Sequence, residues 1–429
     1  MVILIIAILK IYMLFVILVM AVYTLRHNFF TFNRVYGEQK LYYQDIIDSE
    51  LMELSVIIPM YNEEKTASHI LDLLIKSDYP ASKIEIIPIN DNSTDKTKEI
   101  LDSYALKYPI IKPIHRKSEN KGKVPALNEG LKIAKGEIIL VFDADYLPGK
   151  SILRDLALAF KDPKVCSVMG RVMLINTCKN LLTRMLDLER TGGYQVDQQA
   201  RYNLGLIPQY GGTVGGFRRE LIISIGGFDE KILAEDTELT FNLFIKGWDV
   251  AYANRLECYE EGPEEWKTRA NQIKRWSRGH NRVMFKYLIP VITTKYLNFY
   301  QKVDGVLLLF VYMIPFIFLL GMLDSIVLFF WGEMNLVNYV IVYLLIGMYV
   351  TFGSFAPFYQ IGIGAFLDRT SNRIRLLPFF FFIFVFNIWF ISQGFIESVI
   401  DVISSRRVTW HKTKRYRRET ETEAAAAAK

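Results

Sequence analysis

The sequence predicts an α/β domain, with a mostly parallel sheet and helices on both faces, inserted between α-helical membrane segments. Three observations support this. Apolar stretches of strand length alternate with helix-patterned stretches over residues 53–262. One long apolar block precedes this region and three follow it. Finally, 51% of the 429 residues are hydrophobic while 22% are charged, a combination that indicates a chain that is part membrane and part soluble.

The first apolar block, residues 1–25, carries Lys10 as its single charge. It exceeds the ~20 residues that cross a ~30 Å hydrocarbon core, so we predict a transmembrane helix. The alternative is a cleaved signal peptide. The apolar run is too long for one, and no small-residue cleavage site follows it. Residues 26–52 are then predicted to be a linker.

Three further apolar blocks follow Lys302, at roughly 303–331, 336–363 and 376–404. They predict C-terminal transmembrane helices over 303–404. Residues 263–302 are predicted to form amphipathic interface helices, and residues 405–429 a basic tail. The localisation expected from this plan is a multi-pass protein of the cell membrane.

Basic residues near the ends of the spans predict the orientation. Arg26, Arg34 and Lys40 follow the first block, while the linker WGEMN after the second block has no Lys or Arg, so the large domain is expected in the cytosol. The same rule puts the tail RRVTWHKTKRYRR inside, which conflicts with a single crossing by 376–404. A re-entrant or interfacial piece is therefore expected somewhere in the last hundred residues.

Charge and cysteine content exclude several functions. The net charge is +6, and Lys and Arg gather beside apolar blocks, which fits a membrane surface rather than nucleic acid. Cys166, Cys178 and Cys258 are scattered and lack the spacing of a zinc site or a disulfide framework. They are interpreted as free thiols in a reducing compartment.

Polar residues follow each predicted strand of the soluble domain. The strands open the stretches LSVIIPMYNEE (54–64), IEIIPINDNSTDKT (84–97) and GEIILVFDADYLPG (136–149). Helix-patterned segments such as 68–77 and 126–135 lie between them. In parallel α/β sheets, ligands bind at the carboxyl ends of the strands, so the site is predicted there.

Asp143 and Asp145 stand two residues apart, so a turn can direct both carboxylates at one divalent cation. The simpler alternative is a turn with a local Asp cap. Asp91 at the preceding strand end, with Lys121 and Lys123 in NKGK, favours a nucleoside diphosphate with Mg²⁺ or Mn²⁺.

Two later stretches complete the predicted site. Residues 209–248 contain a glycine-rich turn that lets backbone approach a ligand, then Glu235 and Asp236 at a helix start, where an acid is either an N-cap or a general base. The motif QxxRW is formed by Gln272, Arg275 and Trp276, and the simplest interpretation of its Trp among cations is an interfacial anchor.

The order PMYNEE, NDNS, NKGK, FDAD, GGT, AED, QIKRW, followed by membrane blocks and TWHKTKR, resembles the membrane-integrated processive family 2 glycosyltransferases. These include the cellulose, hyaluronan, chitin and poly-N-acetylglucosamine synthases. The motifs resemble this family over residues 53–276, and the architecture does so to residue 415. The resemblance implies a GT-A-type catalytic domain.

The resemblance also implies a role for each motif residue. The expected nucleotide-binding residues are Pro59, Tyr61, Glu63, Asp91, Lys123, Asp143, Asp145, Gln272 and Arg275, of which Asp143 and Asp145 also hold the metal. The expected acceptor-binding residues are Gly211, Gly212, Thr213 and Trp276. Asp236 is the expected catalytic base, with Glu235 beside it. Departures occur at NDNS, where many relatives have DDGS, and at Lys274 within QIKRW.

The reaction expected is a direct, inverting displacement. Mg²⁺ or Mn²⁺ and Arg275 stabilise the leaving diphosphate of a UDP-sugar, while Asp236 deprotonates an acceptor hydroxyl. The favoured function is a polysaccharide synthase that extends a glycan and translocates it across the bilayer. One alternative glycosylates a lipid such as a polyprenyl phosphate or a ceramide. The other is a membrane protein without activity. The sequence does not reveal an accessory subunit or an oligomeric state.

Overall fold

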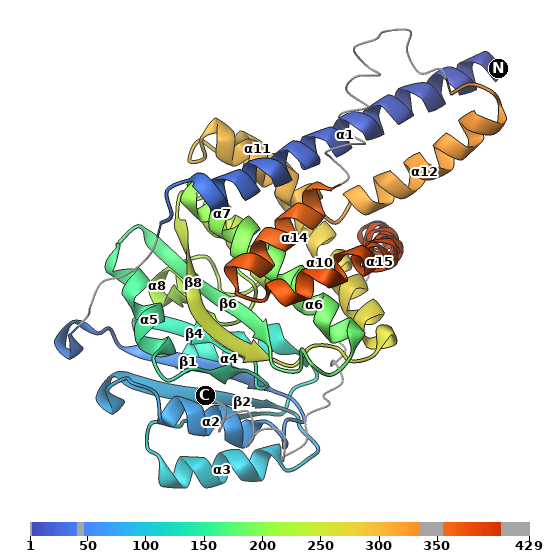
Figure 1. Cartoon of the computed structure of the whole chain (residues 1–429). Helices are drawn as coiled ribbons and strands as arrows, with labels where there is room; N and C mark the ends of the chain where they lie inside the picture. The colour runs from blue at the N-terminus through green and yellow to red at the C-terminus, as the bar shows by residue number, and fades with distance from the viewer. Residues whose placement is uncertain (1, 41–46, 335–354, 405–429) are drawn as a thin grey trace.

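Eight strands form one sheet in the order β3-β2-β1-β4-β7-β6-β8-β5 in the computed structural model, which describes residues 2–40, 47–334 and 355–404 (Figure 1). The pairs β1–β2, β1–β4, β2–β3 and β6–β8 are parallel. β7 runs antiparallel to β4 and β6, and β5 runs antiparallel to β8. The predicted mostly parallel sheet is confirmed, with two antiparallel strands that the sequence pattern did not predict. The strands are β1 (Leu54–Met60), β2 (Ile84–Asp91), β3 (Ile114–Arg116), β4 (Ile138–Val141), β5 (Leu147–Pro148), β6 (Val165–Leu174), β7 (Gly215–Arg218) and β8 (Asp249–Glu260).

Helices cover both faces of the sheet, as predicted. α2, α3 and α5 pack on one face through residues such as Leu71, Leu101 and Leu153, and α4, α8 and α9 pack on the other. The central strands are buried on both faces, which explains their continuous apolar runs. The helices of this domain are α2 (Ala67–Ile75), α3 (Thr97–Lys107), α4 (Lys123–Ile133), α5 (Ile152–Leu158), α6 (Leu181–Thr191), α7 (Gln199–Asn203), α8 (Arg219–Ser224), α9 (Glu235–Phe244) and α10 (Trp266–Thr293).

Two described helices are long and apolar enough to span a membrane: Val2–Tyr36, which is α1, and Ser371–Ser404, which contains α15 (Leu377–Ser404). α1 continues past residue 25, where its end was predicted, and ends at Tyr36. The first eleven residues of the predicted linker, 26–36, are therefore helical. Its last turns are held by the α/β domain, because Arg26 pairs with Asp197 at 3.4 Å and Arg34 donates to the Gln195 carbonyl at 2.6 Å.

The block predicted at 303–331 is a broken pair of helices. α11 (Phe299–Phe310) and α12 (Ile314–Phe330) meet at an angle of 66°. α12 lies beside α1 and leads away from the sheet (Figure 1). The block predicted at 336–363 falls mostly outside the described residues, and α14 (Ala356–Leu367) is its described part. The tail 405–429 is likewise outside them.

α15 lies along α10 for most of its length. Near its start, the Phe386 ring contacts the Trp266 ring at a centroid distance of 4.9 Å, and near its end Asp401 pairs with Arg278 at 2.5 Å. Just before α15, Arg373 pairs with Asp187 of α6. Both ends of α15 therefore contact α10 or segments of the α/β domain.

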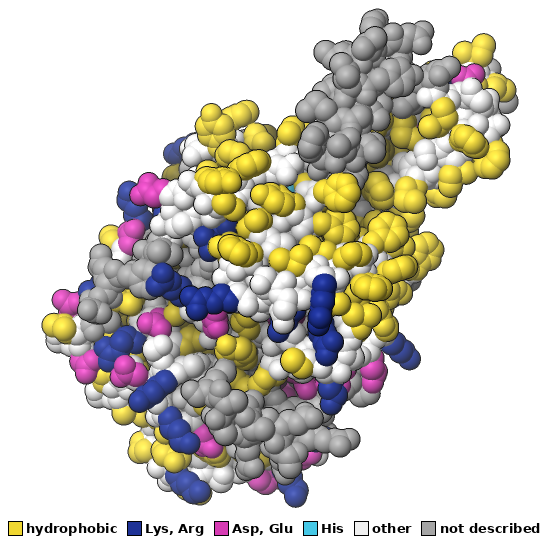
Figure 2. Space-filling model, viewed as in Figure 1, with side chains coloured by type: hydrophobic (Ala, Val, Ile, Leu, Met, Phe, Trp, Pro, Cys, Tyr) yellow, Lys and Arg dark blue, Asp and Glu magenta, His cyan; other side chains and the backbone are white. Residues whose placement is uncertain are grey.

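The face of α15 turned away from α10 is apolar and exposed. Figure 2 shows hydrophobic side chains gathered where α12, α14 and α15 lie. On α15 the large exposed ones include Phe379, Phe382, Val385, Trp389, Ile396, Ile400 and Ile403. They recur at helical spacing, as expected for a helix with one face in the apolar part of a bilayer.

Candidate active site

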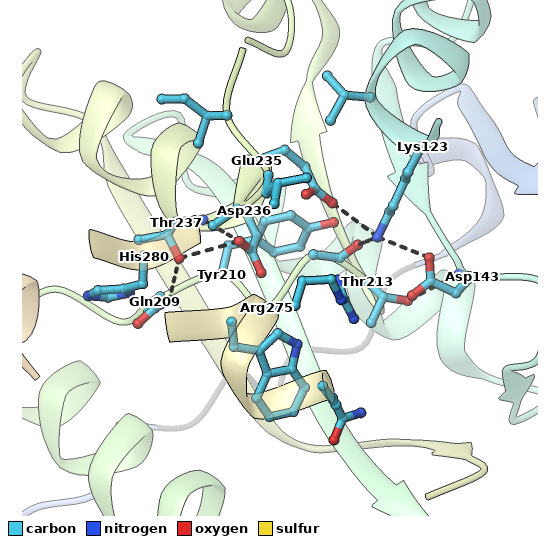
Figure 3. A pocket seen from close by; sticks show the side chains of 18 of the residues that line it. Lys123, Asp143, Gln209, Tyr210, Thr213, Glu235, Asp236, Thr237, Arg275 and His280 are labelled. Atoms are coloured by element: carbon cyan, nitrogen blue, oxygen red, sulfur yellow. Dashed lines mark hydrogen bonds and ion pairs between the residues drawn. The ribbon is translucent and has the colours of Figure 1, made fainter. Parts of the chain in front are cut away.

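One large cavity of about 1500 Å³ lies between the carboxyl-terminal edge of the sheet and α10. Eleven of the predicted site residues line it: Lys123, Asp143, Asp145, Gly211, Gly212, Thr213, Glu235, Asp236, Gln272, Arg275 and Trp276. The cavity also reaches the apolar C-terminal helices at Tyr312, Asp401 and Val402. Figure 3 shows the central residues arranged from Lys123 and Asp143 at one end, past Asp236, to Gln209 and His280 at the other.

Lys123, the first residue of α4, joins three segments of the site. Its Nζ lies 2.9 Å from Asp143 Oδ1 and 3.1 Å from Glu235 Oε1, and it donates to the Gly212 carbonyl at 2.8 Å. Burial alone would lower the pKa of Lys123, but the charges of Asp143 and Glu235 raise it. The lysine is therefore a fixed cation at neutral pH, in reach of any anion bound beside Asp143.

The loop before β7 shapes the centre of the cavity. Gly212 has φ +78°, and a Cβ there would lie 3.1 Å from Asp236 Oδ2. Glycine thus provides both the left-handed backbone and the space beside the carboxylate. Thr213 Oγ1 accepts a hydrogen bond from the Asp143 amide at 3.2 Å, which fixes this loop against the end of β4.

Asp236 lies at the start of α9 and is held by its neighbour. The Thr237 amide donates to Asp236 Oδ1 at 2.6 Å, and Thr237 Oγ1 donates to the same oxygen at 3.3 Å. Burial and the nearby Glu235 charge raise the pKa of Asp236 to about 6. Oδ2 lies on the side of Gly212, so one oxygen is anchored while the other is the candidate proton acceptor.

The sequence did not predict Arg269, which orders the QxxRW motif from one turn upstream. Its guanidinium donates to both carboxylate oxygens of Glu189 at 2.8 Å, donates to Gln272 Oε1 at 3.0 Å, and lies 5.4 Å from the Trp276 ring centroid. This ion pair, in which Nη2 of Arg269 donates to both oxygens of Glu189, fixes α10 to α6, and the cation over the indole orients Trp276. An Arg three residues before the Gln was the available signal.

Four predicted nucleotide-binding residues lie outside the cavity lining: Pro59, Tyr61, Glu63 and Asp91. Asp91 accepts from Arg116 Nη1 at 2.5 Å and from the Gly122 amide at 2.6 Å. In the structure Asp91 therefore fixes the loop that carries Lys121 and Lys123 to the cavity. Its predicted contact with uracil stays a prediction.

The chemistry of the donors at Asp143 and Asp145 fits a hard divalent cation. Both offer carboxylate oxygens, Asp143 at the half-exposed cavity wall and Asp145 more deeply buried. Among the described residues, no group of three or more His, Cys, Asp or Glu side chains is placed to hold a metal. Mg²⁺ commonly binds through one or two carboxylates plus phosphate oxygens and water, and two carboxylates meet that need.

A mostly parallel sheet, covered on both faces and carrying this cavity at its carboxyl edge, is a GT-A-like fold. Residues 55–226 match the family described as Glycosyl transferase family 2. Over these residues the match supports the predicted family 2 glycosyltransferase domain.

Two curated relatives and one solved structure are similar to the chain. "Probable glycosyltransferase YdaM" of Bacillus subtilis (strain 168) is 37% identical over 57% of this chain and 59% of its own length. "Beta-monoglucosyldiacylglycerol synthase" of Nostoc sp. (strain PCC 7120) is 33% identical over 56% of this chain and 51% of its own length. The chain thus spans between half and three fifths of these relatives. The mannosyltransferase PcManGT from Pyrobaculum calidifontis, in complex with GDP-Man and Mn²⁺, shares the fold at 19% identity, with a TM-score of 0.60 over 85% of this chain and 99% of that chain.

Proposed function

We propose that the protein is an inverting, metal-assisted sugar transferase that uses a UDP-sugar and extends a glycan held at the membrane surface. The observation that carries this proposal is the continuity of the cavity. It joins Lys123 and Asp143, where a diphosphate fits, through Asp236 to Trp276 and the membrane-associated helices. The donor can then reach Asp236 from the Lys123 end of the cavity, and the acceptor from the end at Trp276.

Each residue has a defined part in the proposed transfer. Lys123 and Arg275 neutralise the diphosphate as it leaves, and Asp143 and Asp145 would hold Mg²⁺ or Mn²⁺, which supplies further charge neutralisation when bound. Asp236 takes the proton from the acceptor hydroxyl, and that oxygen attacks the anomeric carbon from the face opposite to the diphosphate. Glu235 keeps Lys123 in place.

A lipid acceptor is the second candidate. The relative named beta-monoglucosyldiacylglycerol synthase favours it, and so does the open end of the cavity at Tyr312 and Val402, beside exposed apolar helices. The size of the product separates the two candidates. A synthase makes a polymer that lengthens with time, whereas a lipid transferase makes a product of fixed size that organic solvent extracts.

A donor panel tests the proposed function. Full-length protein in membranes is given Mn²⁺ with UDP-glucose, UDP-N-acetylglucosamine, UDP-galactose or GDP-mannose, and nucleotide release and product size are measured. We expect one UDP-sugar to be used and its sugar to appear in a lengthening glycan. Release of GDP alone, or no release with any donor, would contradict the proposal. Product protected inside inverted vesicles would support translocation.

The path of α15 leads to a proposal about topology. Because both its ends contact the catalytic domain, we propose that α15 lies in the membrane interface and returns the tail to the side of that domain, taken as cytosolic. This resolves the conflict between the basic tail and a crossing by the fourth apolar block, 376–404. α1 and α12 would then form the transmembrane hairpin, closed near its far end by the pair Lys10–Glu333 at 2.7 Å.

Labelling of single cysteines tests this topology. Cys178 is exposed and is first replaced by Ser, while Cys166 and Cys258 are buried. We expect a membrane-impermeant maleimide to label Ser371→Cys and Ser404→Cys in inverted vesicles, and Met334→Cys in vesicles of the opposite orientation. Labelling of Ser404→Cys together with Met334→Cys would show that α15 crosses the membrane.

A further inference from the structure

His280 has one ring nitrogen fixed and the other without a partner. It lies on α10, one turn after Trp276, and is 2% exposed. Its Nε2 lies 3.0 Å from the Leu308 carbonyl oxygen in α11. A carbonyl can only accept, so Nε2 carries the proton of the neutral ring and Nδ1 is an acceptor. Burial lowers the pKa of His280 to about 4, which keeps the ring neutral at pH 7.

Nδ1 of His280 is buried and has no hydrogen-bond partner among the residues that the structure describes. A buried acceptor without a partner is destabilising, so each one needs an explanation. His280 lines the same cavity as Asp236, and its ring lies 4.9 Å from the ring of Tyr312 at the break between α11 and α12. The nitrogen therefore belongs to a residue of the cavity wall, at the end near the membrane-associated helices.

Gln209 and Thr237 connect this end of the cavity to Asp236. Gln209 Nε2 donates to Thr237 Oγ1 at 2.7 Å, and Thr237 in turn donates to Asp236. Gln209 uses its amide nitrogen in this bond, which leaves its amide oxygen as an acceptor. In Figure 3, Gln209 and His280 both lie at the end of the cavity away from Lys123 and Asp143.

We propose that His280 is part of the acceptor subsite, where Nδ1 accepts a hydrogen bond from a hydroxyl of the acceptor other than the one that Asp236 deprotonates. This inference rests on the proposed function and adds the recognition of the acceptor to it. Several hydrogen-bond acceptors near the base suit a ligand rich in hydroxyl groups, such as a sugar residue or a glycerol backbone. The binding step requires a small opening beside the ring, because Nδ1 is covered in the ligand-free protein.

Two substitutions separate binding by Nδ1 from a structural role of Nε2. In His280→Asn the amide oxygen takes the place of Nδ1, while the bond to the Leu308 carbonyl is lost. In His280→Gln the longer side chain keeps a donor near Leu308 but leaves no acceptor at the position of Nδ1. The measurement uses full-length protein in membranes with the UDP-sugar that the donor panel selects, and records the fraction of released UDP that is matched by sugar in product.

We expect His280→Gln to lower this transferred fraction about 5–10-fold, the effect of one neutral hydrogen bond, because water captures more of the donor. We expect His280→Asn to stay within about twofold of wild type. UDP binding and the thermal unfolding midpoint show whether each variant is folded. The opposite order, with Gln near wild type and Asn impaired, would assign His280 to structure alone, and equal behaviour of both variants to wild type would also overturn the inference.

A second measurement uses wild-type protein, in case neither variant folds. Methyl glycosides of the transferred sugar, each lacking one hydroxyl, are offered as acceptors. We expect the loss of one hydroxyl, other than the one that attacks the donor, to lower transfer to that analogue about 5–10-fold. Equal transfer to every deoxy analogue would contradict the inference. If wild type releases UDP from no donor, the proposed function fails instead. If it transfers sugar normally while these tests fail, only the role of His280 is lost.

Discussion

Asp236→Asn is expected to lower the rate of sugar transfer by about 10²–10⁴-fold, the contribution of a positioned general base. Asn has the same size, and its amide oxygen can still accept from the Thr237 amide that now lies 2.6 Å from Asp236 Oδ1. What is lost is the oxygen that takes a proton. UDP binding should therefore stay near that of wild type while incorporation of radiolabelled sugar falls.

Glu235→Gln is the matched control, because it removes the same charge from the adjacent residue. Glu235 pairs with Lys123 at 3.1 Å, so its loss should weaken donor binding and change kcat much less. If Asp236→Asn instead loses UDP affinity and keeps its turnover, then Asp236 belongs to the nucleotide site and another group is the base.

The pH dependence of transfer follows from the same carboxylate. Burial and Glu235 raise the pKa of Asp236 to about 6. A base acts only when deprotonated, so the transfer rate should rise with pH through about 6 and level off above it. In Asp236→Asn the transfer rate should no longer rise with pH through about 6, since the residual rate does not depend on that proton. A wild-type rate that stays flat from pH 5 to pH 8 would contradict the assignment.

Much of the sheet and site could be predicted because their positions are fixed locally. The parallel strands β1, β2 and β4 end at a common edge, which places Asp143 and the loop that carries Lys123 there. The loop before β7 reaches the same edge because β7 runs antiparallel to β4, which the apolar pattern did not predict. The place of Asp236 in the site was implied by the resemblance of the motifs. The contact of Asp91 with Arg116 was not anticipated, because it is a cross-strand pair between β2 and the short strand β3.

The packing of the C-terminal helices could not be predicted from the sequence. Hydropathy identifies 376–404 as long and apolar enough to span a membrane, but it does not reveal that α15 packs along α10. The contacts between the two helices join residues more than one hundred positions apart. Gly394 is one such contact, since a Cβ there would lie 2.6 Å from the Lys274 carbonyl oxygen. No periodic pattern encodes that approach. Arg269 was missed for the same reason, because its partner Glu189 lies on α6.

Removal of the divalent metal is expected to abolish UDP-sugar turnover. Excess EDTA should stop UDP release, and added Mn²⁺ should restore it. Asp145→Asn should lower turnover by about 10²-fold or more, because a buried carboxylate that helps to hold the metal and the diphosphate becomes neutral without changing size. Metal-dependent UDP binding, measured by calorimetry, should weaken in parallel while the thermal unfolding midpoint without ligand stays close to that of wild type.

Glu129→Gln controls for the loss of one negative charge, because Glu129 lies on exposed α4 surface and pairs there with Lys132 at 2.8 Å. It should bind UDP and Mn²⁺ as wild type does. The informative alternative concerns Lys123, which already lies 2.9 Å from Asp143 Oδ1. Lysine and arginine can neutralise a leaving diphosphate by themselves. Full turnover in EDTA would therefore mean that Lys123 and Arg275 are sufficient, and that Asp143 serves to hold the lysine rather than a metal. In that case Asp143→Asn should reduce turnover equally with and without Mn²⁺, whereas a metal ligand should lose its effect once the metal has been removed.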